Sequence, residues 1–261
     1  MPEVLHLDLY SRRRSLVGYL AGIAAYALVV VAMYPAFKNS TSLDNFIRSD
    51  ATAAALFGVT GKISSSGGWL NGNLFANFFP LVMLLLTVGY GAACIAGQDE
   101  EGTLGLVATL PVSRRRLTVE KFATVCLLAL PVAGVTMLCV LIGAGFGLHI
   151  STANLAGATA GVWLLAIDFG ALAMLIGAAT GSRGTALGAT SALAAAAYII
   201  SSLAPVVHWI HPLRFASPFF YAIGDEQLVH GLNAGWAAVL AGIAAVLGIA
   251  TTKAFQRLDV D

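Results

Sequence analysis

Charged residues are scarce in this chain. They make up 10% of its 261 residues, whereas about 25% is typical of a soluble domain, and 58% of the residues are hydrophobic. The mean hydropathy is +0.84. This shortage of charge excludes an ordinary soluble domain and indicates an integral membrane protein. The formal net charge is only +1, so we expect no nucleic-acid partner.

Signals of catalysis and of metal binding are also missing. The three cysteines, Cys94, Cys126 and Cys139, lie in apolar runs at spacings that favour neither disulfides nor a metal site. No Ser-His-Asp triad and no pair of carboxylates can be assembled within one compartment. The nearest string to a phosphate-binding loop, LFGVTGKIS, lacks the first glycine and the final Ser or Thr of that motif. We therefore expect no enzyme activity, no catalytic residue, no metal and no cofactor in this chain.

Long uncharged runs make up most of the sequence. A helix that crosses a bilayer needs about 20 apolar residues, and the uncharged run 122–167 is long enough to hold two. In hydrocarbon every backbone N–H and C=O needs an internal partner, and these runs are too long and too uniformly apolar for barrel strands. We predict an all-α membrane protein with six transmembrane helices in one domain, 1–261. The predicted spans cover residues 15–37, 74–97, 119–147, 155–180, 185–205 and 235–254.

The positions of Lys and Arg predict the orientation. If the N-terminus is cytoplasmic, ten of the 14 Lys and Arg residues lie inside and four lie outside. Cytoplasmic loops carry the excess of these residues, so we predict that both termini are cytoplasmic. Residues 3–14 are predicted to form a helix on the inner membrane surface, with a frayed tail as the alternative. The turn-rich stretch GKISSSGGWLNGN (61–73) predicts irregular structure on the outer side.

A polar stretch, GQDEEGTLGLVATLPVSRRRLTVEK (97–121), separates the second and third spans. Its acids suit the N-terminus of a short helix over about 99–110, because a carboxylate complements the positive end of the helix dipole. Pro111 would end that helix and Ser113 would cap the next one. The three arginines that follow would anchor the third span at the inner headgroups. We therefore predict a short cytoplasmic docking helix that is attached to two spans.

This stretch resembles the signature of the permease subunits of type-2 ATP-binding-cassette (ABC) transporters. Those permeases carry G-x-[DE]-[DE]-x-G-T-L, then an apolar helix, P-[VL]-S-R and a G-K pair. The matching residues are Gly97, Asp99, Glu100, Gly102, Thr103, Leu104, Pro111, Val112, Ser113, Arg114 and Lys121. Glu120 stands where the family usually has Gly. The stretches LFANFFPLVMLLL (74–86) and SPFFY (217–221) also resemble the family, as does the predicted topology.

The resemblance implies a permease subunit that forms the translocation pathway of an ABC transporter in the bacterial cytoplasmic membrane. It implies separate cytoplasmic ATPase subunits that bind ATP and Mg²⁺, and a second permease copy or a sister permease. Spans one, two and five would form the pathway walls, and the cargo would be an exported apolar or amphipathic compound. The implied contacts with the ATPase subunit are Asp99, Glu100, Glu101, Gly102, Thr103, Leu104, Pro111 and Arg114. An ordinary topological loop is the alternative interpretation of the stretch.

Asp168 lies near the middle of the fourth predicted span. A carboxylate at the bilayer centre costs roughly 2.5–3.5 kcal/mol on insertion scales, so it should face protein or water. Two interpretations are open: a polar residue on the translocation path or between subunits, or a protonated or hydrogen-bonded contact between helices. An ion-coupled secondary transporter would need several such charges, and this chain offers only Asp168. That class and a non-transporting membrane anchor subunit are the alternative functions.

Overall fold

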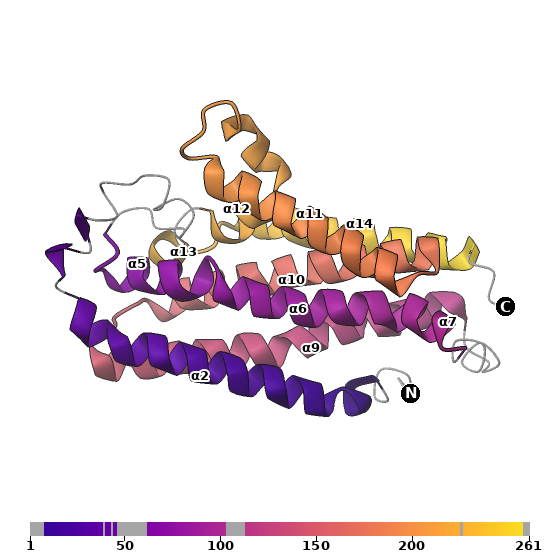
Figure 1. Ribbon diagram of the computed structural model, residues 1–261, viewed down its shortest axis with the longest axis horizontal. Coiled ribbons are helices and arrows are strands. Elements are labelled where there is room, and N and C mark those ends of the chain that lie inside the picture. Colours follow the sequence, from indigo (N-terminus) through magenta and orange to yellow (C-terminus); the bar gives the residue numbers. More distant parts are fainter. Residues whose placement is uncertain are drawn as a thin grey trace.

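The computed structural model describes residues 8–38, 40–42, 44–45, 62–102, 113–224 and 227–257. Within these ranges the chain is a bundle of long helices and contains no strand (Figure 1). The predicted all-helical membrane fold with six spans is confirmed. The six stretches long and apolar enough to cross a membrane are Arg13–Phe37, Ser66–Glu100, Arg114–Phe146, Thr152–Thr180, Arg183–Leu203 and Ala234–Gln256.

The second span is a composite of five short elements, whereas the others are nearly continuous helices. Its elements are α5 (Ser66–Leu70), η1 (Asn71–Phe75), α6 (Phe78–Ala92), η2 (Ala93–Gly97) and α7 (Gln98–Glu100). Both η1 and η2 are π-helical turns, which are wider than α-helical turns and are frequent at functional sites. The remaining spans are α2 (Arg13–Phe37), α9 (Arg114–Ile142) with η3 (Gly143–Phe146), α10 (Thr152–Thr180), α11 (Arg183–Leu203) and α14 (Ala234–Arg257).

The second span begins at Ser66, so the prediction of irregular structure over 61–73 is wrong for its second half. The Ser65 hydroxyl accepts a hydrogen bond from the Gly68 N–H at 3.1 Å and caps α5. The Trp69 indole N–H donates to the Val30 carbonyl at 2.9 Å, and its ring stacks on Phe37. These contacts with α2 hold the segment in a helix although its composition favours turns.

The connection between α11 and α14 holds three short helices. They are η4 (His211–Ala216), α12 (Pro218–Ile223) and α13 (Gln227–His230). The part around η4 projects from the side of the bundle (Figure 1) and leaves the Trp209 side chain 74% exposed. α12 returns to the bundle, where Phe219 packs against Phe169 of α10.

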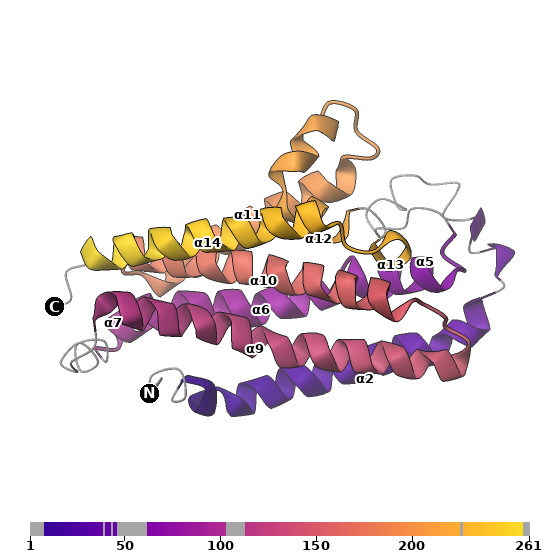
Figure 2. The ribbon, with the colours of Figure 1, turned by 180° about the vertical axis from the view of Figure 1, so that it is seen from behind.

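The start of α2, α7 and the end of α14 lie at the same end of the bundle (Figures 1 and 2). We call this the coupling end, because residues 97–102 and 113–121, the described parts of the stretch 97–121, lie there. An even number of spans brings both termini to one side, as the topology prediction requires. Of the predicted helix over 3–14, residues 3–7 lie outside the described part of the chain. Residues 8–11 are helical, Arg12 is in a turn, and α2 follows directly.

α6 and α10 form the centre of the bundle. In the second and fourth spans 72% and 67% of the most apolar stretch is buried, compared with 22%, 11% and 17% in spans one, five and six. The two central helices meet at Gly91 and Gly170. A Cβ at Gly91 would collide with the Gly170 carbonyl oxygen, and one at Gly170 would lie 2.8 Å from Val125 of α9. Glycine therefore allows three spans to approach at this point.

We predict that Gly91→Ala destabilises the bundle. The added methyl group must push α6 away from α10, and overpacking of this kind costs about 1–3 kcal/mol. Thermal unfolding of the purified chain in detergent should show a lower midpoint. Gly89→Ala is the matched control, because it lies on the same helix and its Cβ would meet nothing within 4 Å. Equal midpoints for both variants would contradict the close approach at Gly91.

Candidate functional site

The helix of the second span ends at Glu100 at the coupling end. The Glu101 and Gly102 N–H groups donate to the carbonyls of Gly97 and Asp99 at 3.1 and 2.9 Å. Gly102 has φ +66°, a left-handed conformation that suits glycine and commonly ends helices. Asp99 and Glu100 therefore close the second span, and the prediction that a new helix begins at Asp99 is wrong. Residues 103–110, the rest of that predicted helix, lie outside the described residues.

Glu100 nevertheless lies at a helix N-terminus, that of α11. Its Oε1 accepts a hydrogen bond from the backbone N–H of Arg183, the first residue of α11, at 2.9 Å. The Ser182 side chain caps the same helix by accepting from Thr185 at 3.3 Å. A carboxylate at this position complements the positive end of the dipole of α11. Glu100 thus connects the second span to the fifth across 83 residues of sequence.

The start of α9 is also held at the coupling end. The Ser113 hydroxyl accepts from the Arg116 N–H at 3.3 Å, so the predicted cap is confirmed. The Arg114 guanidinium donates a hydrogen bond to the backbone carbonyl of Phe255 in α14 at 3.1 Å and also lies over the Phe255 ring. Glu120, where the family usually has Gly, pairs with Arg116 at 2.9 Å.

The predicted ATPase contacts are thus only partly described. Glu101 and Gly102 are exposed, and Asp99 is half-buried. Thr103, Leu104 and Pro111 lie outside the described residues. The structure brings Glu100 to α11 and Arg114 to α14, so these two residues link spans of this chain. Their contact with an ATPase subunit stays a prediction.

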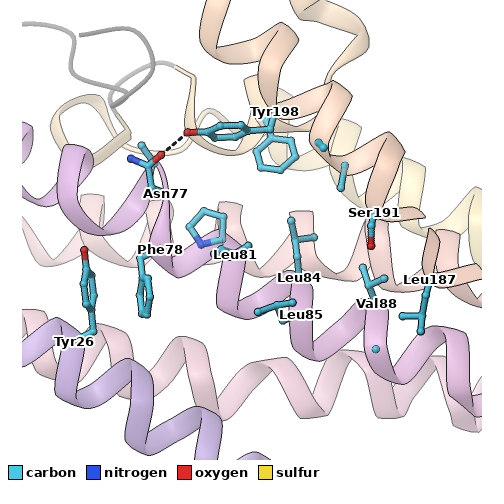
Figure 3. A pocket seen from close by; sticks show the side chains of 16 residues that line it. Tyr26, Asn77, Phe78, Leu81, Leu84, Leu85, Val88, Leu187, Ser191 and Tyr198 are labelled. Carbon is cyan, nitrogen blue, oxygen red and sulfur yellow. Dashed lines mark hydrogen bonds between the residues drawn. The ribbon is translucent and has the colours of Figure 1, made fainter. Parts of the chain in front are cut away.

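A groove of about 540 Å³ runs between α6 and α11, with α2 and α12 contributing to its walls (Figure 3). No charged residue lines it among the described residues. Most of the wall is aliphatic, and a groove of this size with an apolar wall is suited to an apolar ligand. The lining residues are Tyr26, Ala76, Asn77, Phe78, Pro80, Leu81, Leu84, Leu85, Val88, Gly89, Leu187, Ser191, Ala194, Ala195, Tyr198 and Phe219.

The polar groups of the groove gather at the end opposite α7. The Tyr198 hydroxyl donates to the Asn77 side-chain oxygen (Figure 3). The Tyr26 hydroxyl donates to the Asn73 carbonyl at 2.9 Å, and its ring stacks on Phe78 with centroids 3.8 Å apart. Ser191 is the one further polar side chain in the described lining. The groove therefore has a long apolar part and a short polar end.

A family model described as ABC-2 family transporter protein matches residues 3–219. The chain belongs to this ABC-2 transporter family. The match includes the signature stretch 97–121 and every residue given above for the lining of the groove, so the resemblance seen in the sequence is confirmed. A search of curated proteins found no significant match. Family membership and six apolar helices make the chain a multi-pass membrane component of an ABC transporter.

Asp168 is buried in this ABC-2 chain, with 3% of its surface exposed. Neither carboxylate oxygen has a hydrogen-bond partner among the described residues. Asp168 does not line the groove, because the groove faces α6 and α11 and receives no residue of α10. The backbone of Ala244 of α14 lies beside the carboxylate. A role on the translocation path and a contact between helices through Asp168 both stay predictions.

Sequence reasoning missed Tyr26 and Tyr198 as residues of the groove. Asn77 lies at the start of the α6 helix, where turn chemistry is the simpler interpretation of an asparagine. A signal was present in the tyrosines, because a phenol hydroxyl inside a span needs a hydrogen-bond partner. The sequence does not show which helix supplies that partner: Tyr198 and Asn77 are 121 residues apart.

We predict that Glu100→Gln loosens the first turn of α11. A carboxylate near a helix N-terminus contributes about 0.3–1 kcal/mol, so the variant should raise amide hydrogen exchange at Arg183 about two- to fivefold. Hydrogen-exchange mass spectrometry of the purified chain would measure this. Glu101→Gln is the control, since Glu101 is exposed on the same turn. Unchanged exchange in Glu100→Gln would mean that the contact is not kept in solution.

Proposed function

We propose that this chain is the permease subunit of an ATP-driven transporter that exports an apolar or amphipathic compound. Separate cytoplasmic ATPase subunits bind ATP and Mg²⁺ and supply the work. The site of action is the bacterial cytoplasmic membrane, with the coupling end on the cytoplasmic side. Membership of the ABC-2 family supports the permease role.

One observation carries the proposal: the signature stretch is connected to both of the helices that form the groove. α6 forms one wall of the groove and leads through η2 and α7 into the signature. α11 forms the facing wall, and its first residue is bonded to Glu100 of the signature. A push on the segment that follows Gly102 would therefore reach both walls. Alternating access follows when such a push changes the separation of the two helices.

The pathway is proposed to be completed by a second copy of the chain or by a sister permease. α2 and α11, both of which contribute to the groove, are among the least buried spans. A Cβ added at Gly18, Gly22 or Gly188 on these helices would meet nothing within 4 Å in the described part of the chain. Exposed small residues let a neighbouring helix approach closely in a membrane.

The structure favours this function over an ion-coupled secondary transporter. Such a transporter binds its coupling ion with charged groups on the substrate path. The described lining of the groove holds no charge, and Asp168 lies elsewhere. The uncharged lining therefore supports an ATPase subunit, rather than a coupling ion, as the source of energy.

The proposal is tested by co-purification. The tagged full chain, solubilised in a mild detergent, is expected to bring down a protein with a phosphate-binding loop and ATPase activity. Mass spectrometry of the eluate and an ATPase assay identify it. An eluate without any such protein, from cells that express the chain at its natural level, would overturn the permease proposal.

We further predict that filling the groove changes transport. Ala195→Phe places a ring among the side chains that line the groove. A bound compound would then be overpacked, and we expect its apparent affinity to fall about tenfold. Compound-stimulated ATPase activity of the purified complex would measure the loss. Leu193→Phe is the control, because Leu193 is on the same helix, is 51% exposed and does not line the groove. Equal stimulation constants for the two variants would rule out this groove as the compound site.

A further inference from the structure

A fully buried lysine lies at the coupling end, in the second turn of α9. The Lys121 side chain has 0% exposure. Its Nζ donates to the Gln98 Oε1 of α7 at 2.8 Å and lies 3.6 Å from the Asp8 Oδ2. Gln98 immediately precedes the acids of the signature, and Lys121 ends it. The contact therefore closes the base of the loop that carries the signature.

Asp8 supplies the negative charge from the N-terminal segment. Its Oδ2 also accepts a hydrogen bond from the Tyr90 hydroxyl of α6 at 2.6 Å, and the residue is 8% exposed. The Arg12 guanidinium lies 5.0 Å from the centre of the Tyr90 ring. Residues 8–11 form a helical turn that leads directly into α2. Three parts of the chain thus meet at one carboxylate: the N-terminal turn, α6 and α9. α7 joins them through the hydrogen bond between Lys121 and Gln98.

Because Asp8 and Lys121 are both buried, each charge depends on the other for its stabilisation. A charge that is removed from water is costly unless an opposite charge and hydrogen bonds replace the water. Lys121 has no exposed surface through which water could replace Asp8. The N-terminal segment therefore cannot leave its place while Lys121 stays buried. The same burial means that Lys121, although it belongs to the signature, does not present a surface to a partner in this state.

We propose that Asp8, Tyr90, Gln98 and Lys121 form a buried polar latch that ties α2 to the signature loop. This inference rests on the proposed function, in which an ATPase subunit pushes on the loop. The latch holds both stems of the loop, α7 and α9, to the turn that begins α2. α2 carries Tyr26, which lines the groove. Displacement of the loop is thereby passed to a third groove helix, in addition to α6 and α11.

The first test needs no ATPase. Asp8→Asn, Lys121→Gln and the double variant form a thermodynamic cycle on the purified chain in detergent. Each single change leaves a buried polar group without its charge partner and should lower the thermal midpoint by about 10 °C. The double variant should fall no further than either single one, because the interaction is lost only once. Additive shifts would overturn the latch. Lys253→Gln, an exposed lysine at the same end, should leave the midpoint unchanged.

The second test separates force transfer from mere stability. In the complex with the co-purified ATPase, Lys121→Gln should reduce compound-stimulated ATPase activity about fivefold while basal activity and the amount of bound ATPase stay the same. The reciprocal exchange, Asp8→Lys with Lys121→Asp, should restore at least part of the stimulation, since the pair is re-formed with opposite polarity. Tyr90→Phe removes one hydrogen bond, keeps the ion pair and should give an intermediate loss even where Lys121→Gln folds poorly.

The outcomes are distinct for the two proposals. A chain that brings down no ATPase overturns the proposed function, whatever the thermal cycle shows. An ATPase that binds normally, together with additive thermal shifts or with unchanged stimulation in Lys121→Gln and Tyr90→Phe, overturns the latch and leaves the permease function intact.

Discussion

Inside a bilayer every backbone N–H and C=O must find its partner within the protein, and this constraint organises the structure. Polar side chains benefit from such partners too, and several threonines find them locally. The hydroxyls of Thr87, Thr124 and Thr136 each donate to the carbonyl four residues earlier, at 2.8–3.0 Å. Larger polar side chains must reach another helix. Trp163 of α10, for example, donates to the Cys126 carbonyl of α9 at 3.1 Å. Each such contact is both a satisfied donor and a tie between two spans.

These ties are concentrated on the helices that form the groove. At one end Tyr198 joins α11 to Asn77 at the start of α6, and at the other Glu100 joins α7 to α11. The Asp8 and Lys121 pair joins the start of α2 to α7 and α9. By contrast, the centre of the bundle is held by close apolar packing of α6 against α10 at Gly91 and Gly170.

The sequence predicted the parts of this structure that depend on length and on local chemistry. Six spans follow from the uncharged runs, because hydrocarbon leaves a long apolar segment no alternative to a helix. Ser113 caps α9 because a cap needs only the next three residues. The partner of Glu100 could not be predicted, since it lies 83 residues away on α11, and the sequence does not show which spans pack beside that helix. The crossing of Gly91 and Gly170 was missed for a related reason: neither glycine has another glycine four residues away, so no Gly-x-x-x-Gly spacing within one helix marks the pair.

The chemistry of the groove also bears on selectivity. Apolar walls hold a ligand through surface that is removed from water or lipid, and one methylene group more or less changes the affinity only modestly. A polar group that must be matched discriminates more strongly, because a mismatch leaves a buried donor or acceptor without a partner. In this groove such groups lie almost entirely at the Asn77 and Tyr198 end. A compound with an apolar body and one hydrogen-bonding end fits this division. Under the proposed function, the polar end of such a compound would compete for the hydrogen bond between Asn77 and Tyr198 that joins α6 to α11.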